Sequence, residues 1–126
     1  MRLLDIWVAK EAWLHLMQMK KSPQMAYRLY KYGELVLAEL QACDQHRQDL
    51  IREISGISDP NTPVEIEPDT PQMTEYGERF NAFLKEESDI PKLTINMENM
   101  INSLAEVDGN DINEHQLKML ETFFQD

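Results

Sequence analysis

Five residues near the start of a predicted long helix have the types and spacing of an anion-binding site: Lys20, Lys21, Tyr27, Arg28 and Lys31. Arg28 and Lys31 are three residues apart and share one helix face, and Tyr27 lies four residues before Lys31. The free backbone N–H groups of a helix start favour anions. Cations beside an aromatic ring could therefore hold a phosphate or a nucleotide. The alternative is a solvated basic face at a hairpin turn, since basic stripes at helix starts are common.

Oxygen-bearing side chains between Asp108 and Glu114 suggest a calcium site. A loop of the EF-hand type requires oxygen ligands at alternate positions, a glycine at the sixth position and a glutamate at the twelfth. Here Gly109 is second and Met119 is twelfth. The run therefore predicts a turn followed by a helix N-cap rather than a metal site.

The three histidines, His15, His46 and His115, lie far apart in the sequence and have no partner at metal-binding spacing. We expect them at the surface. The sequence contains no nucleophile motif, glycine-rich phosphate loop or zinc pattern. We therefore expect a protein that is not an enzyme and that needs no cofactor.

The long helix that carries the basic cluster should run from Ser22 to Gly56. Ser22 is a good N-cap, Pro23 suits the first helical position, and Gly56 suits the residue after the last turn. A helix of this length spans roughly 48 Å, more than one small domain needs. Apolar residues with three-four spacing form a seam that we expect a second subunit to cover in part; its oligomer-facing members are Val36, Leu40, Cys43, Leu50 and Ile54. Gly33 in mid-helix predicts the close approach of a partner helix.

Residues Leu3 to Met19 read as a first helix with a broad apolar face. The link Lys20–Lys21 is short, so the two helices should form an antiparallel hairpin. The second half of the long helix would then overhang. Trp7 and Trp13 are expected to pack on its first half.

The rest of the chain predicts a smaller α+β portion. The composition divides a single domain (1–126) into a helical hairpin (1–55), a proline-rich linker (56–71) and an acidic helix–strand–helix portion (72–126). The expected elements of this part are a strand at Val64–Ile66 paired with one at Ile90–Ile95, and helices at Pro71–Glu87, at Met97–Leu104 and after a capping box at Asp111–Glu114. The fold class is therefore mainly α, with a long antiparallel helical hairpin followed by a short two-stranded ribbon and two or three short helices.

Charge is divided unevenly along the chain, whose formal net charge is −11. Residues 1–53 hold 8 Lys and Arg against 7 Asp and Glu, whereas residues 54–126 hold 4 against 16. This balance argues against direct nucleic-acid binding by the second half. The single cysteine, Cys43, forms no disulfide framework and reads as a small buried hydrophobe, which fits a reducing cytoplasm. No apolar run approaches the length of a membrane span, and no signal peptide is expected.

The segments RLLDIWVAKEAWLHLM, SPQMAYRLYKYGELVLAEL, RQDLIRE, FNAFLKEESDIPKLTI and NEHQLKMLETFF occur in this order and extend over nearly the whole chain. The most distinctive feature is Pro23 followed by AYRL and Lys31. In this pattern the chain resembles a family of small proteins of tailed phages and prophages of Gram-positive bacteria whose function is unknown. The resemblance implies a phage origin and a setting in the host cytoplasm or the virion; it implies no activity and no catalytic residues.

These observations favour a phage accessory protein that binds and neutralises a host factor, a counter-defence role. For a nucleotide-type signal the expected site is the basic cluster around Arg28. For a host defence protein the expected surface is the acidic second half, which could also imitate nucleic-acid phosphates. The alternative is a structural or assembly protein of the phage tail or head. We further expect a homo-oligomer in the host cytoplasm that has no membrane contact.

Overall fold

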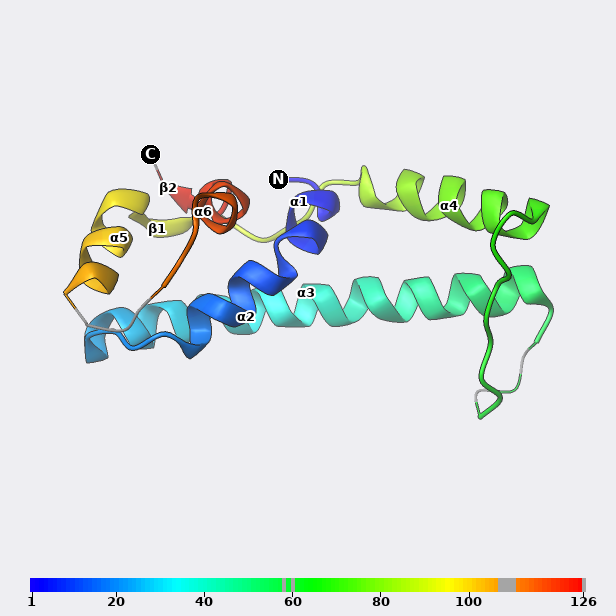
Figure 1. Cartoon of the computed structure of the whole chain (residues 1–126), viewed down its shortest axis with the longest axis horizontal. Coiled ribbons are helices and arrows are strands. Elements are labelled where there is room, and N and C mark those ends of the chain that lie inside the picture. The colour runs from blue at the N-terminus through cyan, green and yellow to red at the C-terminus, as the bar shows by residue number, and fades with distance from the viewer. Residues whose placement is uncertain (58, 60, 107–110, 126) are drawn as a thin grey trace.

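The chain is mainly helical and is built along one long helix, α3 (Pro23–Ser55, 33 residues), which spans the molecule in Figure 1. The structure is a computed structural model that describes residues 1–57, 59, 61–106 and 111–125. Both ends of α3 confirm the sequence prediction. Ser22 Oγ accepts a hydrogen bond from the Met25 N–H at 3.3 Å, and Pro23 opens the helix. Gly56 ends it in the left-handed conformation at φ 73°, which glycine adopts without steric penalty.

The first predicted helix is two helices in the structure, α1 (Leu3–Val8) and α2 (Lys10–Gln18), so the prediction of one continuous helix was wrong. The break lies at buried Ala9, with φ −88° and ψ 0°. It lets the two tryptophans pack on different partners. The Trp13 ring packs on Tyr32 of α3, as expected, with 5.5 Å between the ring centroids. Trp7 instead packs edge-on against Phe80 of another helix, with 5.3 Å between the centroids.

The close approach expected at Gly33 is present in the α2–α3 hairpin. A Cβ atom placed on Gly33 would lie 3.0 Å from both Sδ and Cε of Met17. Contacts this tight are rare, so α2 can lie this close because Gly33 has no side chain.

The second half of α3 is covered by α4 (Pro71–Leu84), which lies alongside it in Figure 1. Thr70 caps α4 and Pro71 opens it, as predicted, but the helix ends three residues before the expected Glu87. The intervening segment after Gly56 is non-helical where described. A hydrophobic cluster joins α1, α3 and α4 through Leu3, Cys43, Leu50, Phe80 and Leu84. The second half of α3, which the sequence predicted as an overhang, is thus covered by α4.

The predicted two-stranded ribbon is present, but the prediction of which segment pairs with the Ile90–Ile95 strand was wrong. Strand β1 (Leu93–Asn96) pairs in parallel with β2 (Phe124–Gln125), whereas Val64–Ile66 forms no strand. Pairing with β2 buries Phe123 and Phe124 beside Trp13, at centroid distances of 5.3 and 6.3 Å. Large aromatic burial of this kind outweighs the strand propensity of a solvated linker segment.

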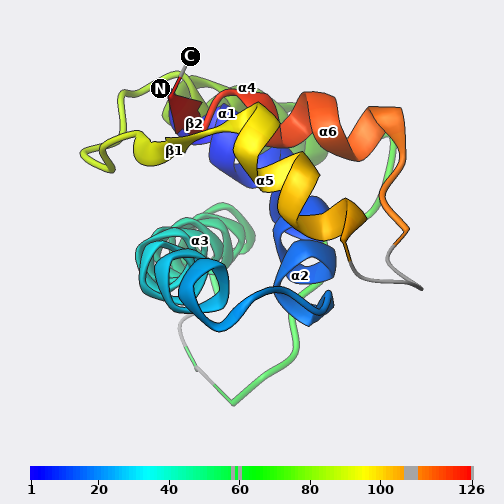
Figure 2. The ribbon, with the colours of Figure 1, turned by 90° about the vertical axis from the view of Figure 1, so that its left-hand side faces the viewer.

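The last two helices flank the strand pair. Helix α5 (Met97–Ala105) follows β1 directly and is capped by Asn96. Helix α6 (Glu114–Glu121) is capped by Asn113 together with Gln116, two residues after the predicted Asp111 cap. Viewed along α3 in Figure 2, α5, α6 and the strands form a layer over α2 and the first half of α3.

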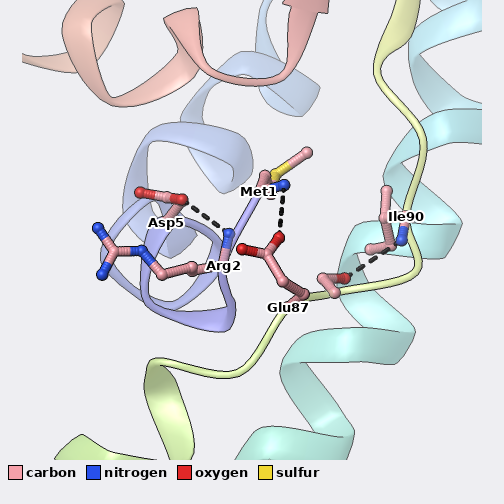
Figure 3. Close-up of polar contacts among 6 residues, drawn as sticks. Met1, Arg2, Asp5, Glu87 and Ile90 are labelled. Carbon is pink, nitrogen blue, oxygen red and sulfur yellow. Dashed lines mark hydrogen bonds and ion pairs between the residues drawn. The ribbon is translucent and has the colours of Figure 1, made fainter.

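The first residues of the chain are fastened to the segment after α4 (Figure 3). The Leu3 N–H donates to the Glu86 carbonyl and the Ser88 N–H to the Met1 carbonyl, each at 2.9 Å. The Met1 amino group forms an ion pair with the Glu87 carboxylate at 3.2 Å. These bonds hold α1 between the α4 end and the strand layer.

Candidate functional site

An open hollow of about 440 Å³ lies between α3 and β1 in the described structure. Three of its lining residues are cations: Arg28 and Lys31 on α3, and Lys92 immediately before β1. The single acidic side chain among the lining residues is Glu34. We name this site the cationic hollow, because its lining carries a local positive charge on a chain whose net charge is −11.

The α3 side of the cationic hollow joins charge to exposed apolar surface. Arg28 and Lys31 lie about one turn apart and are both exposed. Lys31 Nζ lies 5.7 Å from the centroid of the Tyr27 ring, within range of a weak cation–π interaction. Tyr27 is 63% exposed and Leu35 is 49% exposed. Exposed rings beside cations offer a stacking surface next to an anion site.

The strand side of the hollow is held by two backbone anchors on either side of Lys92. The buried Tyr32 hydroxyl donates to the Pro91 carbonyl at 2.8 Å. The Leu93 N–H donates to the Phe123 carbonyl, also at 2.8 Å. Burial raises the pKa of Tyr32 to about 12, so its hydroxyl keeps the donated proton well into the alkaline range. Tyr32 therefore positions the third cation of the hollow.

The predicted basic cluster is divided in the structure. Tyr27, Arg28 and Lys31 line the cationic hollow together, but Lys21 does not. Lys21 Nζ donates instead to the carbonyls of Met17 and Met19, where it neutralises the C-terminal end of α2. Burial lowers the pKa of Lys21.

Lys20 is exposed at the hairpin turn and lines neither this hollow nor the neighbouring one described next. Sequence reasoning missed Lys92. The alternation of β1 places Lys92 and Thr94 on the exposed side of the strand, but only the tertiary fold places that side next to α3.

A second hollow, of about 420 Å³, shares the lining residue Tyr27 with the cationic one. It is mostly apolar and aromatic, and we name it the aromatic hollow; its lining residues are Met17, Lys21, Pro23, Ala26, Tyr27, Leu29 and Tyr30. Tyr30 is 58% exposed, and a hydrogen bond to the Glu34 carboxylate raises its pKa. Tyr27 lines both hollows, so one ligand could contact the two sides of this side chain.

The seam residues of α3 belong to the core of the chain. Val36, Leu40, Cys43 and Leu50 are at most 5% exposed, and Ile54 packs against the cluster that contains Phe80. Because α1, α2 and α4 cover these residues, the reason for expecting a second subunit at this seam no longer holds. Burial, with Glu39 nearby, raises the pKa of the Cys43 thiol to about 11, so the residue is an inert thiol at neutral pH.

The three histidines lie on different helices. A ring nitrogen of His15 hydrogen-bonds with the Asp111 carbonyl, and His46 stacks on Phe83 at 4.0 Å. His115 is exposed on α6. Within the described residues, no group of three or more His, Cys, Asp or Glu side chains could hold a metal ion.

Two further predictions from the sequence concern the Asp108–Glu114 run and membrane-spanning helices. Three residues of the Asp108–Glu114 run, 108–110, lie outside the described residues. Among the described helices, none has the length and apolarity required to cross a membrane.

Comparisons with protein-family models, curated proteins and solved structures found no match for this chain. The resemblance to a phage protein family therefore stays a prediction.

Proposed function

We propose that the protein is a non-enzymatic binding protein that holds a nucleotide-type anion at the cationic hollow. One observation carries the proposal: Arg28 and Lys31 from α3 and Lys92 from the distant strand segment line one hollow, beside the exposed Tyr27 ring. Cations that gather around one concave surface of an acidic chain are better explained by an anionic ligand than by solubility.

The phosphate groups would bind between the three cations. Arg28 can form two parallel hydrogen bonds with phosphate oxygens, and the lysine ammonium groups act as point charges. Hydrogen bonds to a charged group contribute about 1.5–3 kcal/mol each. Glu34 on the rim opposes this attraction, so the ligand should place its charge towards Lys31 and Lys92.

The base would bind at the Tyr27 side, where the aromatic hollow adjoins the cationic one. Stacking of a base on an aromatic side chain contributes about 1–3 kcal/mol. Tyr30 and Met17 line the same hollow and offer further apolar contact. Two adjoining hollows, one cationic and one aromatic, fit a ligand with a charged part and a planar part.

In the setting implied by the resemblance, the protein would act in the host cytoplasm as a phage counter-defence factor that sequesters a nucleotide-type signal. Two other roles compete with this one. The acidic second half could inhibit a defence protein, or the chain could serve the assembly of the phage tail or head. The gene neighbourhood discriminates them, since an assembly protein should be encoded among tail or head genes.

Native mass spectrometry of the protein purified from producing cells tests the proposal. We expect a mass increment of nucleotide size that is lost in the double variant Arg28→Ala, Lys31→Ala. The matched control, Lys10→Ala with Lys85→Ala, removes two exposed cations elsewhere and should keep the increment. The same spectrum reports whether the protein is a homo-oligomer. An increment retained by the double variant, or none in any of the three proteins even after incubation with millimolar ADP, would contradict the proposal.

A further inference from the structure

A groove of about 340 Å³ lies between α5 and α6 and shares no lining residue with the cationic hollow. Figure 2 shows α5 continuing from β1 and α6 leading towards β2. Nothing in the proposed nucleotide site uses this groove. Its lining combines an apolar floor with an acidic rim, and we name it the acidic groove.

The floor of the acidic groove is formed by apolar side chains from three elements. Met97 and Ile101 lie about one turn apart on α5, and Leu117 faces them from α6. Phe124 of β2 closes the floor. Ile101 is 37% exposed, although most large apolar side chains of the chain are covered. A floor with this helical spacing suits the apolar stripe of an incoming helix.

The rim of the groove carries negative charge on both sides. Glu98 lies on the α5 side, and Glu114 and Glu121 lie on the α6 side. The one rim cation, Lys118, lies 3.6 Å from the Glu114 carboxylate, with the two side chains 71% and 86% exposed. Pairs this exposed contribute little to stability, so an incoming cation can replace Lys118 at small cost.

We propose that the acidic groove docks a cationic amphipathic helix of a partner protein. The apolar stripe of that helix would lie on Ile101 and Leu117, and its flanking Lys and Arg side chains would meet Glu98 and Glu121. Charge complementarity selects this partner over a second copy, because each copy carries a net charge of −11 and repels another. The proposal is independent of nucleotide binding in the cationic hollow.

The test uses two fluorescein-labelled helical peptides of 18 residues, one with Leu and Lys and one in which every Lys is replaced by Glu. Fluorescence anisotropy at near-physiological salt measures binding to the full chain. We expect the cationic peptide to bind at least about tenfold more tightly than the acidic one. The double variant Glu98→Lys, Glu121→Lys should bind the cationic peptide at least about tenfold more weakly and the acidic peptide more tightly than the wild-type chain does. A structural role of these two glutamates would produce no such exchange of preference.

The matched control changes the net charge equally on exposed residues away from the groove, Glu65→Lys with Glu78→Lys. It should leave the preference for the cationic peptide intact. An equal loss in the control would show non-specific attraction to an acidic chain and would overturn the proposal. A wild-type dimer dissolved by Glu98→Lys, Glu121→Lys in sedimentation velocity would also overturn it, because the occupant would then be a second copy.

Discussion

The cationic hollow and the acidic groove are both lined by residues of strand β1 and carry opposite charge. Leu93 and Thr94 of β1 line the hollow, whereas Asn96 of the same strand and Phe124 of β2 line the groove. The negative charge of the groove matches the composition of its part of the chain, since residues 54–126 hold 16 acidic and 4 basic residues. The positive charge of the hollow is opposite in sign to the net charge of the chain, −11.

The two surfaces also differ in how they are assembled. The groove is lined by residues of the C-terminal third, from Asn96 to Phe124. The hollow joins α3 to a lysine more than sixty positions further along the chain, held there by the Tyr32 bond to Pro91. Under the proposed function, this charge pattern, which opposes the net charge of the chain and depends on a tertiary anchor, serves one specific ligand. Changes in the hollow should therefore affect one ligand, with little effect on general charge interactions.

The largest expected effect comes from removing both α3 cations of the hollow. Arg28→Ala with Lys31→Ala should weaken the binding of ADP about 100-fold, because two charge-assisted contacts are lost. Isothermal titration calorimetry with ADP, adenosine and pyrophosphate measures the effect. Binding of the cationic peptide to the acidic groove should stay within about twofold. An equal loss of both ligands would show that the two surfaces are not independent.

Alkaline pH should act on the hollow through its anchor. The pKa of Tyr32 is about 12 in the folded chain and near 10 when unfolded. The folded state therefore keeps this proton longer, and its contribution to stability is complete below about pH 10 and is lost as the pH rises towards 12. Tyr32 alone should account for about 2 kcal/mol of the fall in the free energy of unfolding that urea denaturation measures over this range.

The Tyr32→Phe variant is the control for this pH dependence, because it has no hydroxyl to titrate. Cys43, whose pKa is about 11, still titrates in this variant. Its ionisation also lowers the free energy of unfolding above about pH 9. The difference between the two proteins isolates Tyr32. Parallel stability curves from pH 10 to 12 would contradict the assignment.

Removing the strand-side cation should have an intermediate effect. Lys92→Ala should lower the affinity for ADP about tenfold, since one lysine contact with the ligand is lost. Lys85→Ala removes an exposed cation at the end of α4 and serves as the control, with no expected change. Equal affinities for the Lys92 and Lys85 variants would confine the site to α3.

The smallest expected effect comes from the anchor itself at neutral pH. Tyr32→Phe leaves the Pro91 carbonyl without this donor and should lower the free energy of unfolding by about 1 kcal/mol. The Tyr32→Phe variant should also bind ADP a few-fold more weakly, because Lys92 is then less well positioned. Lys92→Ala combined with Tyr32→Phe should bind ADP no more weakly than Lys92→Ala alone. An additive loss would mean that Tyr32 acts on the ligand by another route.

The features that the sequence predicted correctly are local ones. Ser22, Pro23 and Gly56 bound α3 because capping depends on neighbouring backbone groups. Thr70 and Pro71 start α4 for the same reason. The close approach at Gly33 also followed from one residue type in mid-helix.

The features that the sequence did not predict depend on distant contacts. The pairing of Leu93 with Phe124 is decided by burial of the aromatic pair beside Trp13, which no local pattern encodes. The break at Ala9 likewise depends on Phe80, the separate partner of Trp7. Lys92 could not be assigned to the site without that strand pairing, because its neighbours in space are unrelated to its neighbours in sequence.

The most direct test of the central claim is a two-dimensional ¹H–¹⁵N NMR titration of the full chain with ADP. The account predicts saturable shifts confined to the parts of the chain that line the two hollows, residues 17–35 and 92–94. These shifts should be absent from the Arg28→Ala, Lys31→Ala variant and present in the Lys10→Ala, Lys85→Ala control. Shifts centred elsewhere, shifts that persist in the double variant, or none at millimolar ADP would contradict it.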